Sequence, residues 1–551
     1  MDSFNIMYKD EKLEVKKNII FKELIKEYTS ENYHNIALCR LNEKYYELAK
    51  EVKVSGELEF IKINSPIGMK IYSRTLQFIF IKASLDIFPN SKITIEHSIS
   101  KGLFGEIHKE EALCGKDIEK IKARMKDIIQ KDIPINKIKV KREEAIRIFK
   151  SYGMEDKVSL LNHVDFETVN LYELDGRYDY FYGQMAYSTG FIRAFNLTEY
   201  EPGFVLENPM ESDLDKLPPY KDHKKLSQIF LETEKWLNIL GVGEVGSLND
   251  KVESSELNDL IMVSEALHEK KIAYIADMIK IKSETRVVLI AGPSSSGKTT
   301  FANRLGVQLR VNGFIPIRIS LDDYFVNRDD TPTDENGELN FESIYALDLK
   351  LFNEHLNILL GGEEVEIPRY NFKKGEREWP KEKLKLPPNG IVIIEGIHGL
   401  NPILTSAVDD KNKFKIYISA LTQLNLDNHN RIATTDIRRL RRIVRDYLSR
   451  DYGAEQTLIM WPSIKRGEQK NIFIYQEEAD VMFNSTLVYE LCVLKKYALQ
   501  ELEKIKPESP VYLEAKRLKS FLGFFKEIDK EYVPGNSILR EFTGGSIFYK
   551  Y

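Results

Sequence analysis

The segment Gly292-Pro-Ser-Ser-Ser-Gly-Lys-Thr299 carries the most direct chemical signal in the chain, because it matches the pattern G-x-x-x-x-G-K-T. An apolar run, 287–291, precedes it, and a helical pattern follows it. The two glycines permit a tight backbone path that points N–H groups at phosphate oxygens, Lys298 adds a positive charge, and the Thr299 hydroxyl is suited to Mg²⁺. The segment predicts a nucleoside triphosphate site made by Gly292, Pro293, Ser294, Ser295, Ser296, Gly297, Lys298, Thr299 and Thr300.

Two carboxylates follow later apolar runs. Asp322 comes directly after the run 315–321, and Glu395 closes the run 390–394. Ligands of parallel α/β folds bind beyond the carboxyl ends of the strands, so both acids are expected near the γ-phosphate. An isolated Asp at a strand end is more often a turn residue. Two acids behind one phosphate loop instead indicate phosphoryl transfer, which needs a metal-side group and a carboxylate that orients the acceptor hydroxyl.

An arginine-rich helix is expected beyond these acids. Arg438, Arg442 and Arg445 are spaced to share one helical face, and Arg439, Arg441 and Arg450 enlarge the cluster. Such a charged run is often only a solvated face. Its single sign favours a lid that lays guanidinium groups over the transferred phosphoryl group.

Four regions must position these residues. We predict a small β/α unit over 1–62, a second unit over 63–210, a helical connector over 211–282 and a carboxy-terminal unit over 283–551. The connector contains two amphipathic helices, 224–240 and 256–279, that we expect to pack on their neighbours. The last unit alternates strand and helix signals, as a mostly parallel sheet requires. The predicted fold class is therefore multidomain α/β and α+β.

Composition narrows the classes of protein. The 551 residues carry a net charge of −5, which gives no general attraction to nucleic acid or anionic membranes. Cys39, Cys114 and Cys492 form no C-x-x-C pair, as expected in a reducing cytoplasm without structural zinc. No secretory signal and no apolar run of about 18 residues is present, so we expect a soluble cytoplasmic protein without a membrane partner.

The carboxy-terminal motifs, taken together, resemble the uridine kinase/phosphoribulokinase family. They are the phosphate loop followed by Asp322-Asp-Tyr-Phe, Asn340-Phe-Glu, Ile367-Pro-Arg-Tyr-Asn-Phe, Ile394-Glu-Gly-Ile and Arg441-Arg-Ile-Val-Arg-Asp. The resemblance implies ATP and Mg²⁺, with Asp322 as the catalytic aspartate and Glu395 and Thr299 on the metal side. It also implies that Arg442 and Arg445 are lid arginines, that Glu342 holds ribose hydroxyls, and that Tyr324, Phe325 and Tyr370 line a nucleoside pocket.

One departure from that family concerns the base. Uridine-cytidine kinases place a base-reading histidine shortly after the Tyr-Asn-Phe segment, whereas Phe372-Lys-Lys-Gly-Glu-Arg377 contains none. The resemblance therefore implies a nucleoside or related metabolite as acceptor and leaves recognition of uracil or cytosine open.

The amino-terminal half resembles two other modules. Residues 1–62 look like a TGS domain, and the following region looks like the second amino-terminal, editing-type domain of threonyl-tRNA synthetase. The latter resemblance is carried by Leu85-Asp-Ile-Phe-Pro, Ile95-Glu-His-Ser, Gly102-Leu-Phe-Gly-Glu and Ser188-Thr-Gly-Phe-Ile-Arg-Ala-Phe. Where the synthetase has two histidines, a cysteine and a histidine, this chain has Arg74, Phe78, Phe181 and Met185. None of these can act as ligand or base, which predicts a loss of zinc binding and hydrolysis.

The leading hypothesis is an ATP- and Mg²⁺-dependent kinase that phosphorylates a hydroxyl group of a small molecule. The alternatives are an RNA- or tRNA-associated NTPase and a nucleotide-sensing regulatory protein. Residues 1–62 contain eleven Lys and Arg against twelve Asp and Glu, whereas a domain that grips phosphates normally has a basic excess. RNA therefore remains possible but is not favoured, and a homo-oligomer is possible.

Overall fold

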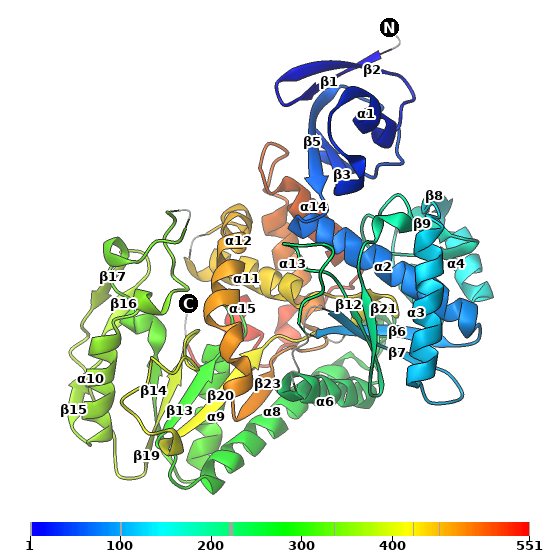
Figure 1. The fold of residues 1–551 in the computed structure, drawn as a ribbon. Coiled ribbons are helices and arrows are strands. Elements are labelled where there is room, and N and C mark those ends of the chain that lie inside the picture. The colour runs from blue at the N-terminus through cyan, green and yellow to red at the C-terminus, as the bar shows by residue number, and fades with distance from the viewer. Residues whose placement is uncertain are drawn as a thin grey trace. The chain divides into compact units, whose positions relative to one another are not determined.

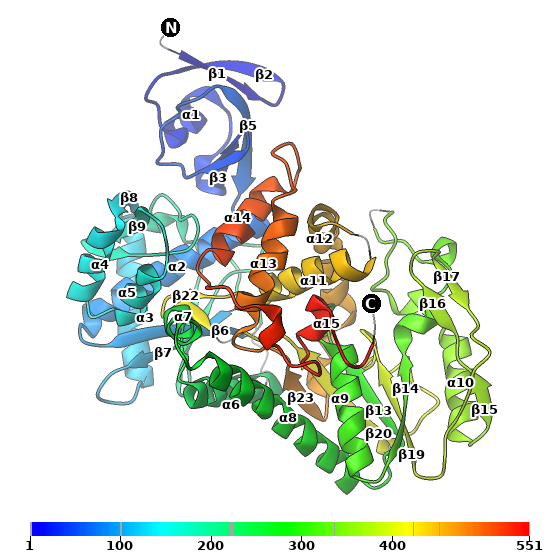
Figure 2. The same cartoon turned by 180° about the vertical axis from the view of Figure 1, so that it is seen from behind.

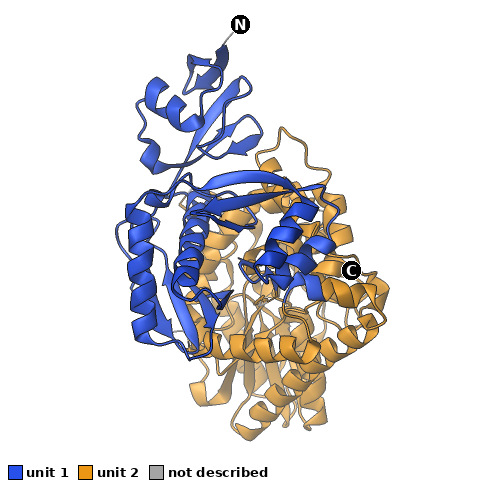
Figure 3. Cartoon of the chain, turned by 90° about the vertical axis from the view of Figure 1, so that its right-hand side faces the viewer, with its two compact units in different colours: residues 1–222, 244–247, 425–431 blue, residues 223–243, 248–424, 432–551 orange. Residues whose placement is uncertain are grey.

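The computed structural model describes residues 3–99, 102–219, 224–335, 337–422, 424–450 and 452–549. It divides into two compact units, which Figure 3 colours separately. Unit 1 contains Met1–Asp222, Glu244–Ser247 and Asn425–Arg431, and unit 2 contains His223–Gly243, Leu248–Leu424 and Ile432–Tyr551. Unit 1 therefore includes a short segment that lies, in sequence, within the carboxy-terminal half. The sequence did not predict that residues 425–431 would belong to unit 1.

Unit 1 begins with a five-stranded sheet in the order β2-β1-β5-β3-β4. An amino-terminal hairpin, a crossing helix and a strand parallel to the first give the ubiquitin-like arrangement expected of a TGS domain, visible in blue in Figure 1. Phe21, Leu24 and Ile25 of the helix are buried, so its apolar face covers the sheet. The elements are β1 (Ser3–Tyr8), β2 (Glu11–Lys16), α1 (Phe21–Tyr28), β3 (Ile36–Leu41), β4 (Lys44–Tyr46) and β5 (Gly56–Lys62).

The rest of unit 1 is an α+β region built around the long helix α2 (Pro66–Ile87). Ser65 caps this helix by accepting a hydrogen bond from the Gly68 N–H group, and Pro66 fits the first turn. Two sheets, β11-β12-β7-β6 and β10-β9-β8, complete the region. Its other elements are β6 (Lys92–Ile99), β7 (Gly102–His108), α3 (Gly115–Gln130), β8 (Asn136–Lys141), α4 (Arg142–Ser151), α5 (Glu155–Asn162), β9 (Thr168–Leu174), β10 (Arg177–Asp179), β11 (Asn196–Tyr200) and β12 (Gly203–Glu207).

Three helices follow before the phosphate loop. They are α6 (Lys224–Leu240), α7 (Val245–Glu253) and α8 (Leu257–Ile281). The bounds of α6 match the predicted helix, α8 corresponds to the second predicted helix, and α7 was not predicted. In unit 2, α6 packs against strand β23 (Val481–Asn484), and α8 packs against α9 (Lys298–Val311).

The central sheet of unit 2 consists of five parallel strands in the order β14-β19-β13-β20-β23. The mixed α/β fold class and the predicted parallel sheet are therefore confirmed. Figures 1 and 2 show the sheet from its two sides, and α9 packs against β13, β14 and β19. The strands other than β23 are β13 (Val287–Ala291), β14 (Ile315–Ser320), β19 (Gly390–Glu395) and β20 (Lys413–Ser419).

Smaller elements surround this sheet. The segment between β14 and β19 holds α10 (Leu349–Leu360), β15 (Glu364–Glu366), β16 (Arg369–Asn371), β17 (Glu376–Glu378) and β18 (Lys383–Lys385). The carboxy-terminal helices are α11 (Thr434–Arg450), α12 (Ala454–Asn471), α13 (Glu490–Leu502), α14 (Tyr512–Leu522) and α15 (Arg540–Thr543). Among the residues that the structure describes, no helix is long and apolar enough to cross a membrane.

Candidate active site

The phosphate loop lies between β13 and α9, as its sequence predicted. β13 is buried along its whole length in the middle of the sheet, so the loop leaves from a fixed point. Gly297 has a φ angle of 85°, which favours glycine, and a Cβ atom on Gly292 would lie 2.0 Å from the Ile418 carbonyl oxygen. Lys298 Nζ donates to the Pro293 carbonyl oxygen at 3.1 Å. Both glycines are therefore required by the backbone path of the loop.

Glu395 and Thr299 meet beside this loop. Strand β19 pairs with β13 on one side and β14 on the other, which brings Glu395 opposite Ile290 and Ser320. The Thr299 hydroxyl group donates to Glu395 Oε1 at 3.3 Å, and the Ser320 hydroxyl group donates to the same oxygen at 2.9 Å. Burial, together with the charge of Asp322, raises the pKa of Glu395 to about 7.

These oxygen ligands suit Mg²⁺, which prefers carboxylate, hydroxyl and phosphate oxygens. A buried carboxylate whose pKa is raised gains most from a nearby cation, and Lys298 supplies only part of that charge. Burial lowers the pKa of Lys298, while Glu395 and Asp322 act in the opposite direction. The residues present therefore fit the metal that the sequence predicted here.

Asp322 and Asp323 follow β14 in one short 3-10 turn, Leu321–Tyr324, but differ in their environment. Asp323 Oδ1 accepts the Tyr370 N–H group at 3.2 Å, and burial raises the pKa of Asp323 to about 6. Within the described part of the chain, the Asp322 carboxylate makes no hydrogen bond or ion pair. Its charge nevertheless raises the pKa values of both Glu395 and Lys298. Of the two aspartates, Asp322 is the one available to an incoming group.

Two of the arginines on α11 support the phosphate loop itself. Arg438 donates to the Ser294 carbonyl oxygen at 3.0 Å and pairs with the buried Glu468, which also accepts the Ser294 N–H group at 2.9 Å. Arg441 donates to the Ser295 carbonyl oxygen at 3.3 Å. Both arginine side chains are almost completely buried. Two members of the arginine cluster that the sequence assigned to a lid over the phosphoryl group thus hold the loop backbone.

The other arginines of α11 that approach the site gather around Asp446. Arg442 Nε lies 3.0 Å from one carboxylate oxygen of Asp446, and Arg445 Nη2 lies 2.6 Å from the other. Arg442 Nη1 also donates to the Ser294 hydroxyl group at 2.8 Å. Arg450 lies near the same carboxylate; the neighbouring charge of Arg445 and burial lower its pKa to about 10. Three guanidinium groups on a single buried carboxylate leave a net positive charge beside the loop.

The three residues predicted to line the nucleoside pocket lie in two different environments. Tyr324 belongs to the protein core, whereas Phe325 and Tyr370 form part of an aromatic surface. Tyr324 is fully buried, and its hydroxyl group lies 3.1 Å from His355 Nδ1. Phe325 and Tyr370 pack with ring centroids 5.6 Å apart, and both contact the half-exposed Phe372. The sequence did not single out Phe341, which packs on Phe325, as an acceptor residue.

Glu342 lies next to helix α12. Its side chain packs against Gly467 of that helix, and burial raises the pKa of its carboxyl group. Arg442 lowers that pKa, so the two side chains lie within electrostatic range of each other. Glu342 is therefore brought to the arginine group.

In unit 1, the four residues that align with the editing residues of the synthetase lie together. The rings of Phe78 and Phe181 pack with centroids 5.0 Å apart, and Met185 Sδ lies 3.9 Å from the Thr75 hydroxyl group. Arg74 donates to the Gln184 carbonyl oxygen at 2.5 Å. The structure thus gathers these positions between α2 and the segment 181–185.

The hairpin 425–431 packs beside this cluster within unit 1. Gln77 of α2 donates to the His429 carbonyl oxygen, and Asn430 Oδ1 accepts the Tyr182 N–H group at 2.8 Å. His429 Nδ1 lies 2.7 Å from Asp179, whose carboxylate also pairs with Lys157 at 3.1 Å. Lys157 and Asp179 are almost completely buried. This part of unit 1 therefore includes a segment of the carboxy-terminal half of the chain.

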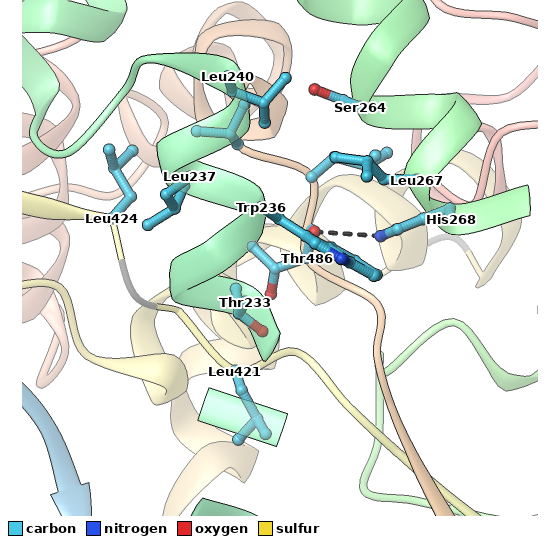
Figure 4. A pocket seen from close by; sticks show the side chains of 12 residues that line it. Thr233, Trp236, Leu237, Leu240, Ser264, Leu267, His268, Leu421, Leu424 and Thr486 are labelled. Atoms are coloured by element: carbon cyan, nitrogen blue, oxygen red, sulfur yellow. Dashed lines mark hydrogen bonds between the residues drawn. The ribbon is translucent and has the colours of Figure 1, made fainter. Parts of the chain in front are cut away.

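A separate apolar pocket lies in unit 2 between α6 and α8 (Figure 4). The rings of Trp236 and His268 lie tilted against each other with centroids 5.7 Å apart, and His268 Nε2 donates to the Thr486 carbonyl oxygen at 3.3 Å. Burial lowers the pKa of His268 to about 3, so the ring is neutral at physiological pH. The predicted connector helix α6 thus buries Ile229 and Phe230 and lines this pocket with Thr233, Trp236, Leu237 and Leu240.

A parallel sheet with a phosphate loop, a carboxylate behind each of two neighbouring strands and an arginine-rich helix define a P-loop kinase. Residues 287–490 match the phosphoribulokinase/uridine kinase family, and this part of the chain forms a domain of that family. The family resemblance drawn from the sequence is thereby confirmed for the carboxy-terminal half.

The amino-terminal part is similar to threonine–tRNA ligases. The enzyme of Syntrophotalea carbinolica is 33% identical over 162 residues, which cover 29% of this chain and 25% of that protein. The enzyme of Fusobacterium nucleatum subsp. nucleatum is 28% identical over 207 residues, which cover 36% and 33%. The chain thus spans about a quarter to a third of the length of these curated relatives.

Two of the solved structures that match part of this chain bear the names of kinases. A possible uridine kinase from Bacillus stearothermophilus is 21% identical, with a TM-score of 0.25, and the match covers 36% of this chain and 89% of that one. The D-glycerate 3-kinase of Cryptococcus neoformans var. grubii is 16% identical, with a TM-score of 0.24, and the match covers 48% and 91%.

Proposed function

We propose that this kinase transfers the γ-phosphate of ATP to a hydroxyl group of a nucleoside or a related sugar-containing metabolite. The observation that carries the proposal is the contrast between two carboxylates at one edge of the sheet. Glu395 contacts the phosphate-loop residue Thr299, whereas Asp322 lies nearby without a hydrogen-bond partner among the described residues. One carboxylate suits the metal side of the reaction, and the other suits the acceptor side.

On the phosphate side, the loop N–H groups and Lys298 would hold the triphosphate. Thr299 and Glu395 would hold Mg²⁺, which, when bound, neutralises phosphate charge and orients the γ-phosphate. The positive group around Asp446, made by Arg442, Arg445 and Arg450, would stabilise negative charge that develops during transfer. Arg438 and Arg441 would act indirectly, because they hold the loop carbonyl groups.

On the acceptor side, Asp322 would accept a hydrogen bond from the attacking hydroxyl group and take its proton as the O–P bond forms. The half-exposed rings of Phe341 and Phe372, backed by Phe325 and Tyr370, offer a surface on which a flat base can stack. Glu342 would accept hydrogen bonds from sugar hydroxyl groups. Tyr324 belongs to the core beneath this surface and would support it without contacting the acceptor.

A substrate screen tests the proposal. ATP consumption is measured with a panel of nucleosides and phosphorylatable sugars, and RNA is added as a competitor. We expect at least one small hydroxyl compound to support turnover that Asp322→Asn lowers by about 10² or more and that the exposed control Asp329→Asn preserves. ATP hydrolysis that responds to RNA and to no small acceptor would contradict the proposal and favour an RNA-associated NTPase.

For the amino-terminal module we propose a structural role without hydrolysis. Phe78, Phe181 and Met185 supply no metal ligand or general base, and Arg74 is tied to a backbone carbonyl group. The neighbouring hairpin 425–431 gives this region a partner within the same chain. Release of serine from mischarged Ser-tRNA by the purified protein would contradict this role.

A further inference from the structure

The carboxy-terminal segment 537–549 contacts the first turn of helix α9. Glu541 Oε2 accepts the backbone N–H group of Thr300 at 3.0 Å. The Thr300 hydroxyl group lies 2.7 Å from the Tyr549 hydroxyl group. Glu541 is only 7% exposed, so this carboxylate is buried against the phosphate loop. Both contacts fall on the last residue of the predicted phosphate-binding segment.

The Thr300 N–H group is one of the donors that a phosphate loop offers to its ligand. The first N–H groups of a helix have no partner within the helix, and together with the helix dipole they favour an anion. A carboxylate at this position satisfies the same requirement as a phosphate oxygen. The charge of Glu541 also raises the pKa values of Glu395 and Lys298, so its field reaches the groups assigned to metal and phosphate.

A nucleotide phosphate and Glu541 cannot both take this donor at full strength. One N–H group makes one well-aligned hydrogen bond, and two anions at hydrogen-bond distance from it repel each other. Bound nucleotide must therefore displace Glu541 or be weakened by it.

We propose that segment 537–549 is an internal competitor for the nucleotide site, in which Glu541 stands where a phosphate oxygen of the nucleotide would bind. The proposal rests on the proposed function, since it assumes that the phosphate loop binds ATP. Nucleotide binding then expels Glu541, breaks the Tyr549 contact and releases the end of the segment. The affinity for nucleotide is set by this competition as well as by the loop.

The rest of the segment has one anchored part and one part suited to movement. Ile538 packs so closely on Gly297 that a Cβ atom added there would lie 2.5 Å from Ile538 Cγ2. The Phe542 ring packs against Arg441, with 4.9 Å between the ring centroid and the guanidinium carbon. Gly544 and Gly545 follow directly, each with a φ angle of 76°. Two successive glycines in this region can change conformation without the cost that a side chain would impose. The anchor precedes Gly544, and the Tyr549 contact lies beyond Gly545.

The simpler alternative is that Glu541 only caps α9. A cap contributes to folding and is retained when ligand binds, so its removal lowers stability and leaves nucleotide affinity unchanged or weaker. A competitor also contributes to folding, but its removal strengthens nucleotide binding. The two roles therefore predict opposite changes in affinity.

Calorimetric titration of the full-length protein with Mg²⁺-ADP distinguishes them without any acceptor. We expect Glu541→Gln to bind ADP about tenfold more tightly, the scale of a charge-assisted hydrogen bond that no longer competes. The exposed Glu531→Gln makes the same charge change as a control and should leave the affinity unchanged. Unchanged or weaker ADP binding by folded Glu541→Gln would overturn the proposal.

A second variant and a second measurement keep the test independent of folding defects. Tyr549→Phe retains the Glu541 charge and should strengthen ADP binding by a smaller factor, because it removes only the second contact. In the wild-type protein, ADP should increase hydrogen exchange in residues 544–549, and decreased exchange there would overturn the proposal. If ADP binds neither to the wild type nor to Glu541→Gln, the proposed function fails together with the competitor proposal. If ADP binds equally well to the two proteins, only the competitor proposal fails.

Discussion

Arg441 and Glu490 form a two-pronged ion pair, with Nε 3.0 Å from Oε1 and Nη2 2.6 Å from Oε2. Both side chains are essentially inaccessible to water. The remaining donors of Arg441 reach the Ser295 carbonyl oxygen, the Ser485 hydroxyl group and the Ser485 carbonyl oxygen. The pair thus connects α11, α13 and the phosphate loop, where Ser295 has an unfavourable φ angle of 59°.

Glu490→Gln should destabilise unit 2 by about 3–5 kcal/mol, because it leaves the buried Arg441 charge without its carboxylate. Chemical denaturation measures the change in the free energy of unfolding. The exposed Glu508→Gln serves as a matched control and should change it by less than about 0.5 kcal/mol. A loss no larger than that of the control would mean that the pair does not support the loop.

Lys298→Ala should remove phosphoryl transfer and leave the fold intact. Within the described part of the chain, the Lys298 side chain is held by a hydrogen bond to the Pro293 carbonyl oxygen, so its removal costs little packing. What is lost is charge stabilisation in the transition state. Turnover is measured under saturating substrate, with circular dichroism as the check on folding. Turnover within about tenfold of wild type in a folded variant would contradict the assignment of the phosphate site.

Asp322→Asn should lower kcat by about 10² or more, with little change in ATP affinity, since a general base is lost. Asp323→Asn is the matched control, because an asparagine oxygen can still accept the Tyr370 N–H group that Asp323 accepts. Its kcat should stay within a few-fold of wild type. Equal losses in the two variants, or a collapse of ATP affinity in Asp322→Asn, would indicate a structural or metal-binding role for Asp322.

The sequence predicted the edge of the sheet where the candidate site lies, because that prediction needed only local rules. A buried strand, a glycine-rich loop and an acid at the end of each of two apolar runs determine where Lys298, Asp322 and Glu395 must go once the strands are parallel. The structure adds the strand order, which makes β19 the neighbour of both β13 and β14.

Features that depend on distant contacts could not be read from the sequence. Helical spacing predicted that Arg438 and Arg442 share one face of a helix. In the structure Arg438 pairs with Glu468, whereas Arg442 pairs with Asp446. The hydroxyl group of the buried Tyr324 pairs with His355, which lies 31 residues away. The contact between Glu541 and Thr300 joins residues 241 positions apart, and no local pattern marks it.

The raised pKa of Glu395 predicts an opposing pH dependence for stability and metal binding. The group holds its proton more strongly in the folded protein, at about 7, than at its ordinary value of 4.5. Its contribution to stability therefore falls as pH rises between those values, by at most about 1.4 kcal/mol per pH unit. Mg²⁺ competes with the same proton, so apparent Mg²⁺ affinity should rise over that range.

Thermal denaturation of the metal-free protein and of Glu395→Gln between pH 5 and pH 8, a range of about three units around the raised pKa, tests this dependence. The difference between their stabilities should shrink or reverse as pH rises, since only the wild type has a carboxyl group to ionise. Parallel profiles would show that Glu395 does not titrate in this range. Calorimetry with Mg²⁺ provides the second readout, and a pH-independent affinity would contradict the metal assignment.

Asp179→Asn should destabilise unit 1 and release the hairpin 425–431 from it. Burial alone would raise the pKa of Asp179, but the charges of Lys157 and His429 lower it below its ordinary value. Asp179 therefore stabilises the fold at neutral pH, and this contribution is lost only as pH falls through the lowered pKa. Asparagine removes the charge at every pH and leaves Lys157 with less compensation, at a cost of about 3 kcal/mol or more.

Hydrogen exchange should rise in residues 425–431, while the exposed Asp165→Asn should leave it unchanged. Because Ile432 and Ala433 alone separate the hairpin from α11, kinase turnover should be measured in the same samples. Unchanged exchange in a folded Asp179→Asn protein would mean that the backbone contacts at Gln77 and Tyr182 hold the hairpin without this buried pair.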